Sequence, residues 1–259
     1  MNILQSIEKI FFANGRYWGG LNSSLYNSGS IWAMNTGIES ADLNMVWNEK
    51  PLTAGNLKDI QYIKNHFRKA RLPFWWWVFP GASSLNTGNM LKAEGLSLVL
   101  SVPSMFANLT SRAGESTDNN LQIRQIKNKE DLSLWEEVSF AGFDFPRETR
   151  KQYHRFVGTF NLKSDSPQKF FLAFVNRQPV ATSLLFMHEN AGGIYFDSTL
   201  SSERKKGIGL TLTLATMSFA KKAGAAFVTL QSSPDGLRVY KQAGFKEYCK
   251  ADVYSLTSQ

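Results

Sequence analysis

The stretch from residue 192 to 224 reads GGIYFDSTLSSERKKGIGLTLTLATMSFAKKAG, and it decides the fold. It predicts a strand, a short basic loop with two glycines, and then an apolar helix. Glycine lets the backbone approach a ligand closely, and the first N–H groups of a helix have no partner inside the helix. Three cations stand beside this helix end: Arg204, Lys205 and Lys206. The stretch therefore predicts a site for a phosphate or pyrophosphate group.

The composition of the chain allows one large domain or two of ordinary size, because its 259 residues are 43% hydrophobic and 13% aromatic. The net charge of +8 is uneven. Residues 1–120 carry 10 Lys and Arg against 8 Asp and Glu, whereas residues 121–259 carry 19 against 13. The basic excess accompanies the predicted phosphate loop, and nucleic acid is the other partner that such charge attracts. A basic surface without any such partner is an equally good interpretation.

Metal and disulfide chemistry are not expected. Cys249 is the only cysteine, so it offers neither an intramolecular disulfide nor a cysteine-based zinc site. His66 and His154 fall on predicted helices without a second ligand at metal-binding spacing. The first 15 residues lack the apolar run of a signal peptide, and no stretch approaches the roughly 20 apolar residues of a membrane-spanning helix. We expect a soluble, cytoplasmic protein without a membrane partner.

The patterns outside the opening stretch predict two halves of similar plan. The first half is predicted as a helix at 2–13, a Gly/Asn/Ser-rich loop at 14–29, strands at 30–36 and 43–47, a helix at 53–71, an aromatic core strand at 74–79, a short helix at 86–93 and a strand at 96–102. The second is predicted as a strand at 121–126, helices at 129–140 and 147–158, hairpin strands at 169–175 and 180–187, strands at 194–200 and 227–231, a short helix at 237–242 and a strand at 245–256.

The shared plan suggests a tandem duplication joined by a polar linker at residues 113–120. We therefore expect one domain at residues 1–115 and a second at residues 120–259. The first half has no counterpart of the loop at 204–209, so only the second is expected to hold the phosphate site.

The loop 204–209, Arg-Lys-Lys-Gly-Ile-Gly, resembles the coenzyme A loop of GNAT acetyltransferases, the GCN5-related N-acetyltransferases. The later run from Tyr240 to Phe245, Tyr-Lys-Gln-Ala-Gly-Phe, resembles the closing signature of the same family. The resemblance covers residues 121–259, and residues 1–112 resemble the degenerate first module of tandem members. It implies an α/β (α+β) fold of two GNAT-like modules, each a mixed, mostly antiparallel twisted sheet flanked by helices.

The resemblance also implies a site. Strands ending at Thr199 and Gln231 would splay apart, and the pantetheine of acetyl-CoA, or of another acyl-CoA, would pair with backbone between them. A primary amine would attack the thioester, a backbone N–H near Leu200 would polarise its carbonyl, and Tyr240 would protonate the leaving thiolate. The implied cofactor-binding residues are Ser198, Thr199, Leu200, Arg204, Lys205, Lys206, Gly207, Ile208, Gly209, Ser232 and Tyr240.

The sequence departs from the family pattern in three places. Lys205 stands where Gly is usual, and Ser232 stands with Ser233 where an Asn often contacts the cofactor. The usual Glu base is not evident, and strict alternation places Asp197 on one strand face with Tyr195 and Thr199. Asp197 is therefore a candidate base or a partner for the acceptor's ammonium, or else an Asp satisfied by turn N–H groups.

The acceptor side is less defined. Asp144 and Glu148 lie in the segment that lines the acceptor site of the resembled fold, so they are candidates for binding an amine. Asp144 is alternatively a helix cap, and Tyr240 is alternatively a core aromatic residue.

Three functions follow as hypotheses. The first is an acyl-CoA-dependent N-acyltransferase, expected to transfer acetyl to a primary amine of a small molecule or peptide in a ternary complex. The others are an acetyl-CoA-binding sensor without turnover and a tRNA-linked aminoacyl transferase. Nucleic acid is the less favoured partner because no aromatic-rich RNA-binding signature is present. A monomer or a homodimer is expected.

Overall fold

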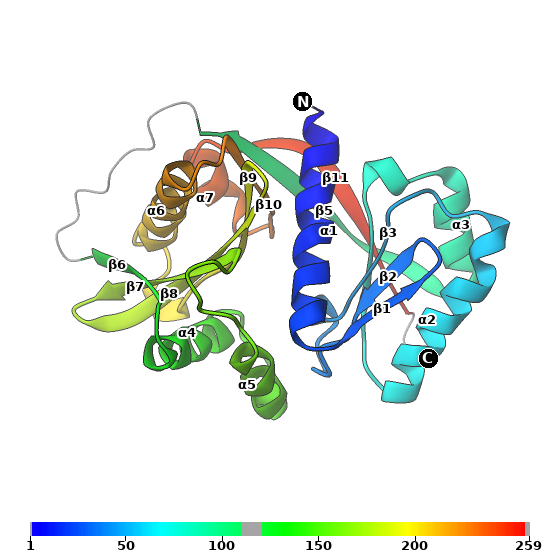
Figure 1. The fold of residues 1–259 in the computed structure, drawn as a ribbon, viewed down its shortest axis with the longest axis horizontal. Coiled ribbons are helices and arrows are strands. Elements are labelled where there is room, and N and C mark those ends of the chain that lie inside the picture. The colour runs from blue at the N-terminus through cyan, green and yellow to red at the C-terminus, as the bar shows by residue number, and fades with distance from the viewer. Residues whose placement is uncertain (1, 110–120, 257–259) are drawn as a thin grey trace. The chain divides into compact units, whose positions relative to one another are not determined.

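The computed structural model describes residues 2–109 and 121–256, and Figure 1 traces its helices and strands. The α-helices are α1 Ile3–Leu21, α2 Leu57–Ala70, α3 Leu85–Ala93, α4 Lys129–Gly142, α5 Arg150–Gly158, α6 Ile208–Lys222 and α7 Leu237–Gln242. The strands are β1 Leu25–Ser28, β2 Ile31–Met34, β3 Met45–Asn48, β4 Trp75–Val78, β5 Leu96–Asn108, β6 Leu121–Gln125, β7 Gln168–Val175, β8 Gln178–His188, β9 Ala191–Thr199, β10 Phe227–Gln231 and β11 Lys246–Leu256. Short 3-10 helices are η1 Ala41–Leu43, η2 Ala54–Asn56, η3 Pro80–Ala82, η4 Arg147–Thr149 and η5 Ser201–Glu203. Within the described residues, no helix is long and apolar enough to cross a membrane.

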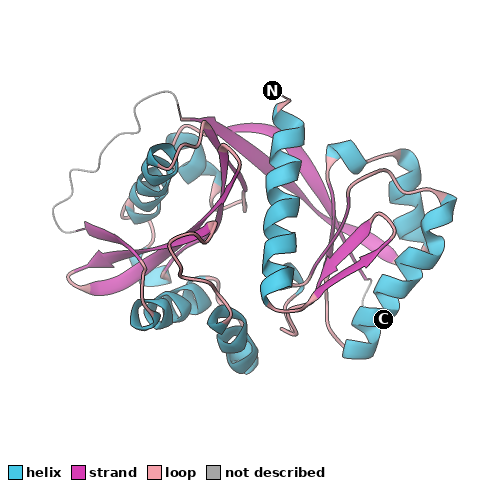
Figure 2. Cartoon of the chain, viewed as in Figure 1, coloured by secondary structure: helices cyan, strands magenta, loops and turns pink. Residues whose placement is uncertain are grey.

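The predicted mixed α/β fold is confirmed, since helices and strands interleave along the described chain (Figure 2). The chain divides into two compact units. Unit 1 holds residues 2–104, 151–159 and 248–256, with the strand order β1-β2-β3-β4-β11-β5. Unit 2 holds the other described residues, with the order β5-β10-β9-β8-β7-β6. Most pairings are antiparallel, and β3–β4 and β9–β10 are parallel. The expected linker at 113–120, with the domain boundaries at 115 and 120, lies outside the described residues.

The loop predicted at residues 14–29 is wrong. Helix α1 continues to Leu21 and β1 follows at Leu25. The glycines that suggested a loop are packing positions instead, because a Cβ at Gly15 would lie 3.0 Å from the ring of Trp47. A Cβ at Gly19 would lie 2.8 Å from the Cβ of Leu25. Only glycine lets α1 approach its neighbours this closely, and that gain outweighs its poor helix propensity.

The core of unit 1 is built on the alternation of the tryptophan strand β4. Trp76 and Val78 belong to a buried cluster with residues of α2 and α3. Trp77 points the other way, with its ring 5.0 Å from that of Phe11 on α1. Trp76 is fully buried and Trp77 is 7% exposed, so the prediction that this run forms core is confirmed.

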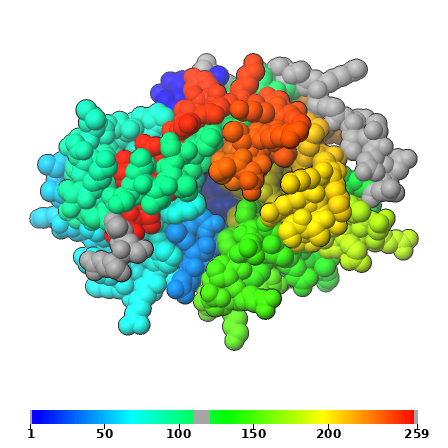
Figure 3. All heavy atoms as spheres, turned by 180° about the vertical axis from the view of Figure 1, so that it is seen from behind, coloured from blue at the N-terminus to red at the C-terminus, as the bar shows by residue number. Residues whose placement is uncertain are grey.

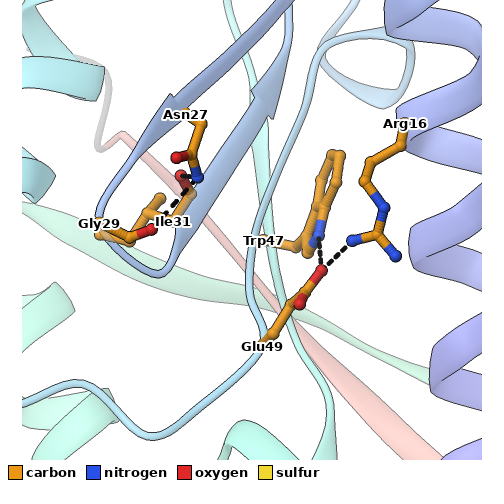
Figure 4. Close-up of polar contacts among 6 residues, drawn as sticks. All are labelled: Arg16, Asn27, Gly29, Ile31, Trp47 and Glu49. Carbon is orange, nitrogen blue, oxygen red and sulfur yellow. Dashed lines mark hydrogen bonds and ion pairs between the residues drawn. The ribbon is translucent and has the colours of Figure 1, made fainter.

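Polar contacts fix two edges of unit 1 (Figure 4). Glu49 accepts hydrogen bonds from the indole N–H of Trp47 and from the guanidinium of Arg16, which ties the end of β3 to α1. Asn27 donates through Nδ2 to the carbonyl of Ile31 at 3.1 Å, closing the turn between β1 and β2.

Unit 2 carries helices on both faces of its sheet, with α4 on one face and α6 and α7 on the other (Figure 1). The predicted hairpin of β7 and β8 is confirmed, and Asn176 and Arg177 both have positive φ in its two-residue turn. The apolar face of α6 is buried in a core cluster with residues of β8, β9 and β10, including Leu212, Leu185 and Val228. This packing holds the start of α6 against the ends of the strands.

Candidate functional site

Strand β9 contains a bulge that sets the direction of its side chains. Leu184 of β8 pairs with Tyr195, but Thr182 pairs with Ser198, so β9 carries one extra residue between these pairs. Phe196 adopts a left-handed φ of 52° at this point. Gly192 faces Ala220 of α6. Asp197 also faces α6, although it lies five residues later and strict alternation would put residues an odd number apart on opposite faces. Strict alternation is therefore broken, and the expectation that Tyr195 shares a face with Asp197 is wrong.

The two central strands of unit 2 separate after a short parallel ladder. The registered pairs of β9 and β10 end at Gly193 and Thr229, although β9 continues to Thr199. Within the described chain, the β10 side of β9 therefore has no strand partner beyond Gly193. The predicted splaying of these strands is confirmed, and it leaves backbone donors and acceptors for an added extended segment.

The N-terminus of α6 has free backbone donors. Gly207 is the N-cap, with φ of 81°, and no side chain caps the helix. The first turn holds no acidic residue. No acceptor among residues 2–109 and 121–256 bonds to the N–H groups of residues 205–209, and the first such bond of the helix runs from Thr211 to Gly207. Residues 204–207 are exposed, and Figure 3 shows the region from about 200 to 245 at the molecular surface, in yellow to orange. This arrangement matches an anion site.

The three loop cations have different roles. Arg204 donates to the carbonyl of Thr199 at 3.0 Å and to that of Gly142 at 2.9 Å, so it fastens the loop to β9 and to the end of α4. Lys206 forms an ion pair with Glu203 at 3.1 Å. Lys205 is exposed, adopts φ of 64°, and makes no contact with another charged group of the described chain. Its ammonium is the one best placed to meet an incoming anion.

Replacing Lys205 with Ala is expected to weaken the affinity for coenzyme A by about threefold to tenfold at low salt, with less effect at physiological salt. The physical reason is the loss of one exposed charge beside the helix terminus. The measurement is calorimetric titration at two salt concentrations. Lys222→Ala is the matched control, because that exposed lysine lies at the far end of α6, about 20 Å away along the helix. Equal effects of the two variants would contradict the prediction.

Asp197 is a carboxylate with a strongly altered proton affinity. Its Oδ2 accepts a hydrogen bond from the hydroxyl of Thr213 at 3.1 Å, and its buried Oδ1 has no well-formed bond within the described chain. Burial raises the pKa of Asp197 to about 7, and the hydroxyls of Ser183 and Thr213 offset part of that rise. A carboxylate with this pKa accepts protons near neutral pH, as a general base must.

Tyr240, on α7, lies close enough to Asp197 for their charges to interact. Burial is the main cause that raises the pKa of Tyr240 well above its usual value, and the carboxylate of Asp197 raises it further. The phenol therefore stays protonated and able to donate. Gly236 makes room for this ring, because a Cβ there would lie 2.7 Å from Cε2 of Tyr240. Two candidates 43 positions apart in the sequence are thus brought to one place.

The sequence prediction missed the hydroxyl groups that hold Asp197. Thr213 and Thr216 lie on the buried face of α6, and Thr216 donates to the hydroxyl of Ser183 at 3.1 Å. Two threonines at spacing i and i+3 on an otherwise apolar helix face indicate that buried polar groups lie opposite them, and this pattern could have predicted the contact.

Other predicted site residues are placed as follows. Ser232 is buried, and its hydroxyl donates to the carbonyl of Ser233 at 2.8 Å, so it is held within its own loop. The hydroxyl of Ser198 bonds to Thr182 at 2.8 Å. The N–H of Leu200 donates to the carbonyl of Val180 at 2.9 Å, so this donor points to β8. The N–H predicted near Leu200 to polarise a thioester is therefore not that of Leu200 itself, and the role of a neighbouring N–H stays a prediction.

The acceptor candidates lie after α4. Asp144 is exposed, has φ of 55°, and follows the last turn of α4, where its N–H donates to the carbonyl of Ala141 at 3.2 Å. It lies just after Phe143, the C-cap of α4, in the left-handed conformation that ends many helices, and its side chain does not cap a described helix. Glu148 is also exposed, in η4. Their role in binding an amine stays a prediction.

No family model and no curated protein matches the sequence. Solved structures do match. A GCN5-related N-acetyltransferase from Kribbella flavida aligns over 96% of this chain and 96% of its own, with a TM-score of 0.73 and 15% identity. One from Sphaerobacter thermophilus covers 87% and 76%, with a TM-score of 0.65 and 14% identity. A putative GNAT-family acetyltransferase from Novosphingobium aromaticivorans covers 93% and 94%, with a TM-score of 0.55 and 11% identity. At these identities the likeness establishes the fold.

Proposed function

Because the chain has the fold of the GCN5-related N-acetyltransferases, we propose that it is an acyl-CoA-dependent N-acyltransferase that transfers acetyl from acetyl-CoA to a primary amine. The observation that carries the proposal is the uncapped start of α6 directly beside the open edge of β9. The diphosphate of the donor fits the N–H groups of residues 205–209, and its pantetheine fits the unpaired backbone of β9.

The reaction needs a base, a carbonyl-polarising donor and an acid. Asp197 accepts the proton that the acceptor's ammonium releases, and the neutral nitrogen then attacks the thioester carbon. The N–H of Leu200 points to β8, which leaves the N–H of Thr199, one residue earlier, on the open side of β9 to polarise the carbonyl. The carbon–sulfur bond breaks as the carbon–nitrogen bond forms, and Tyr240 gives its proton to the leaving thiolate. The proton that the nitrogen loses as it becomes an amide restores the phenol of Tyr240, so the step balances. The products are an N-acyl amide and free coenzyme A.

A primary amine is the proposed acceptor class. A glucosamine N-acetyltransferase region of a fungal multidomain enzyme aligns over 87% of this chain and 31% of its own, with a TM-score of 0.56 and 14% identity. That protein acts on an amino sugar, which supports an amine acceptor here without naming it. The exposed carboxylates of Asp144 and Glu148 are suited to hold such an ammonium group before it loses its proton.

The test has two steps. Calorimetric titration with acetyl-CoA is expected to give a Kd well below about 1 mM. A thiol-reactive dye should then report free coenzyme A with at least one member of a panel of primary amines. Absence of binding at millimolar acetyl-CoA would overturn the whole proposal. Binding without thiol release from any amine would instead favour a sensor that does not turn over.

Tyr240→Phe is expected to lower kcat by about 100-fold while leaving the Kd for acetyl-CoA unchanged. The phenylalanine keeps the ring packing against Phe245, at 5.9 Å between centroids, but lacks the acidic proton. The measurement is steady-state kinetics with the best amine of the panel. Tyr62→Phe, at a 55% exposed position of α2, is the control for loss of a hydroxyl. Unchanged kcat in Tyr240→Phe would remove this residue from the reaction.

A further inference from the structure

A cluster of aromatic rings lies in unit 2 where α4 ends, and part of it is exposed. Phe143, the C-cap residue of α4, is 40% exposed. Its ring stacks with that of Phe145 and meets that of Phe196, on β9, edge to face, each at 5.6 Å between centroids. Phe145 and Phe196 are themselves partly exposed. Single exposed apolar side chains are ordinary, whereas exposed rings gathered in one place are typical of a binding surface. We call these three residues the aromatic patch.

The end of α4 holds these rings in fixed positions. The N–H of Phe145 donates to the carbonyl of Phe140 at 3.2 Å, and the N–H of Asp144 donates to that of Ala141 at 3.2 Å. These two bonds, with the left-handed φ of 55° at Asp144, form a Schellman motif. The motif explains the contact between Phe140 and Phe145, at 5.9 Å between centroids, because it brings these two positions together. It gives no structural reason for an aromatic side chain at Phe143.

The groups around the aromatic patch support it from behind. Trp135 is fully buried, and its ring lies 5.3 Å from that of Phe196. The guanidinium of Arg150 lies over the ring of the neighbouring Phe140, at 4.9 Å from its centroid. Phe143 is the most exposed of these rings. It is therefore the one that offers the most apolar surface to a ligand.

The aromatic patch adjoins the proposed acyl site. Gly142 lets the end of α4 approach β9 closely, because a Cβ there would lie 2.5 Å from the hydroxyl of Ser198 and 3.7 Å from the backbone nitrogen of Thr199. Arg204 joins the same two segments, since its guanidinium donates to the carbonyls of Gly142 and Thr199. Phe143 directly follows Gly142 in the chain. Its ring therefore lies near the N–H that is proposed to polarise the thioester.

We propose that the aromatic patch binds the side group of the acceptor, so that the preferred substrates are primary amines with an aromatic or bulky aliphatic group. This inference rests on the proposed acyl transfer and specifies its acceptor. An apolar group gains free energy when it leaves water for the ring of Phe143, and an aromatic group also gains from ring–ring contact. A sugar carries hydroxyls that lose water here without gaining polar partners from the three rings. The fixed rings lower the entropy cost of binding.

The test compares 2-phenylethylamine, ethylamine and glucosamine as acceptors, with the release of coenzyme A as the measurement. We expect kcat/KM for 2-phenylethylamine to exceed the values for the other two amines by about tenfold or more. Phe143→Ala should raise KM for 2-phenylethylamine about tenfold and leave kcat/KM for ethylamine unchanged. Phe143→Leu keeps an apolar side chain and should retain most of the preference. Tyr62→Ala, at a 55% exposed aromatic position of unit 1, is the control and should behave as the unmodified chain does.

A binding measurement separates this proposal from the proposed reaction. Calorimetric titration of the full chain with 2-phenylethylamine, in the presence of coenzyme A, should give a Kd at least about tenfold lower than titration with ethylamine, and Phe143→Ala should abolish the difference. This result without turnover of any amine would support the aromatic patch and reject the reaction. Turnover without preference for 2-phenylethylamine, or with a preference that Phe143→Ala keeps, would overturn the proposal while acyl transfer stands. Neither binding nor turnover of 2-phenylethylamine would also overturn it.

Discussion

Replacing Gly207 with Asp is expected to weaken acetyl-CoA binding by at least about 100-fold and to leave the chain folded. The carboxylate would stand at the N-cap of α6 and compete with the diphosphate for the same N–H groups, since Asp is a preferred N-cap residue. A Cβ at this position meets no atom within 4 Å, so there is space for the side chain. The left-handed φ of 81° costs about 1 kcal/mol, which is small against the roughly 5–15 kcal/mol that hold a typical domain folded. Calorimetric titration gives the affinity, and thermal unfolding gives the stability.

Two controls separate the causes of this loss. Gly207→Asn has nearly the same shape without the charge and should weaken binding by only about tenfold. Gly95, in unit 1, has the same φ of 81° and equally open space around its Cα. Gly95→Asp therefore introduces the same backbone strain without a charge at α6, and it should bind acetyl-CoA normally. Normal binding by Gly207→Asp would show that the start of α6 does not hold the diphosphate.

Asp197→Asn is expected to lower kcat/KM by about 100-fold or more and to abolish the rise in activity with pH that is centred near 7. The asparagine keeps an oxygen for Thr213 but accepts no proton. The measurement is a profile of kcat/KM against pH between about 5 and 9. Asp235→Asn, an exposed carboxylate of the same unit, is the control. A variant that keeps the inflection near pH 7 would assign that inflection to another group.

The same substitution should stabilise the protein at alkaline pH. The pKa of Asp197 is raised by folding from 3.8 to about 7, so between these values the folded state holds a proton that the unfolded state has released. Stability is therefore full below about pH 4 and falls as the pH rises through 7, by up to roughly 4 kcal/mol. Asp197→Asn removes this loss, and urea unfolding at pH 5 and 8 should show a gain that is larger at pH 8. A destabilised variant at pH 8 would contradict the buried charge.

The opposite outcomes of these two effects make Asp197 informative. If Asp197 were only structural, its replacement would lower the stability of the protein. If it is kept for its chemistry, its buried charge lowers the stability, and its replacement raises it. Lower activity together with higher stability is therefore the result that distinguishes a base from a structural residue.

Sequence patterns that act between residues close together in the chain predicted helices, strands and turns well. The short helix at 237–242 and the strand at 227–231 have the predicted bounds, and the apolar helix after the basic loop ends before Gly224. Gly207, Gly224 and Gly244 have positive φ, as turn and cap positions require. Capping, turn formation and periodicity act within a few residues, so the sequence contains the information directly.

Structural features that depend on contacts between residues far apart in the chain were missed or misinterpreted. Gly15 and Gly19 have the composition of a loop, but α1 uses them to pack closely. The bulge at Phe196 exists only because β8 sets the register of β9, and it reverses the side-chain alternation that strand periodicity predicts. The hydroxyls around Asp197 come from β8 and α6, so no local pattern joins them.

The sequence by itself determined the loop at 204–209, the helix that follows it and the resemblance that these carry, because an anion site at a helix terminus is made of consecutive residues. Only the tertiary structure decided that Asp197 and Tyr240 interact and that β9 opens away from β10. Each of these depends on residues far apart in the chain, whose proximity arises from packing and burial rather than from any local preference.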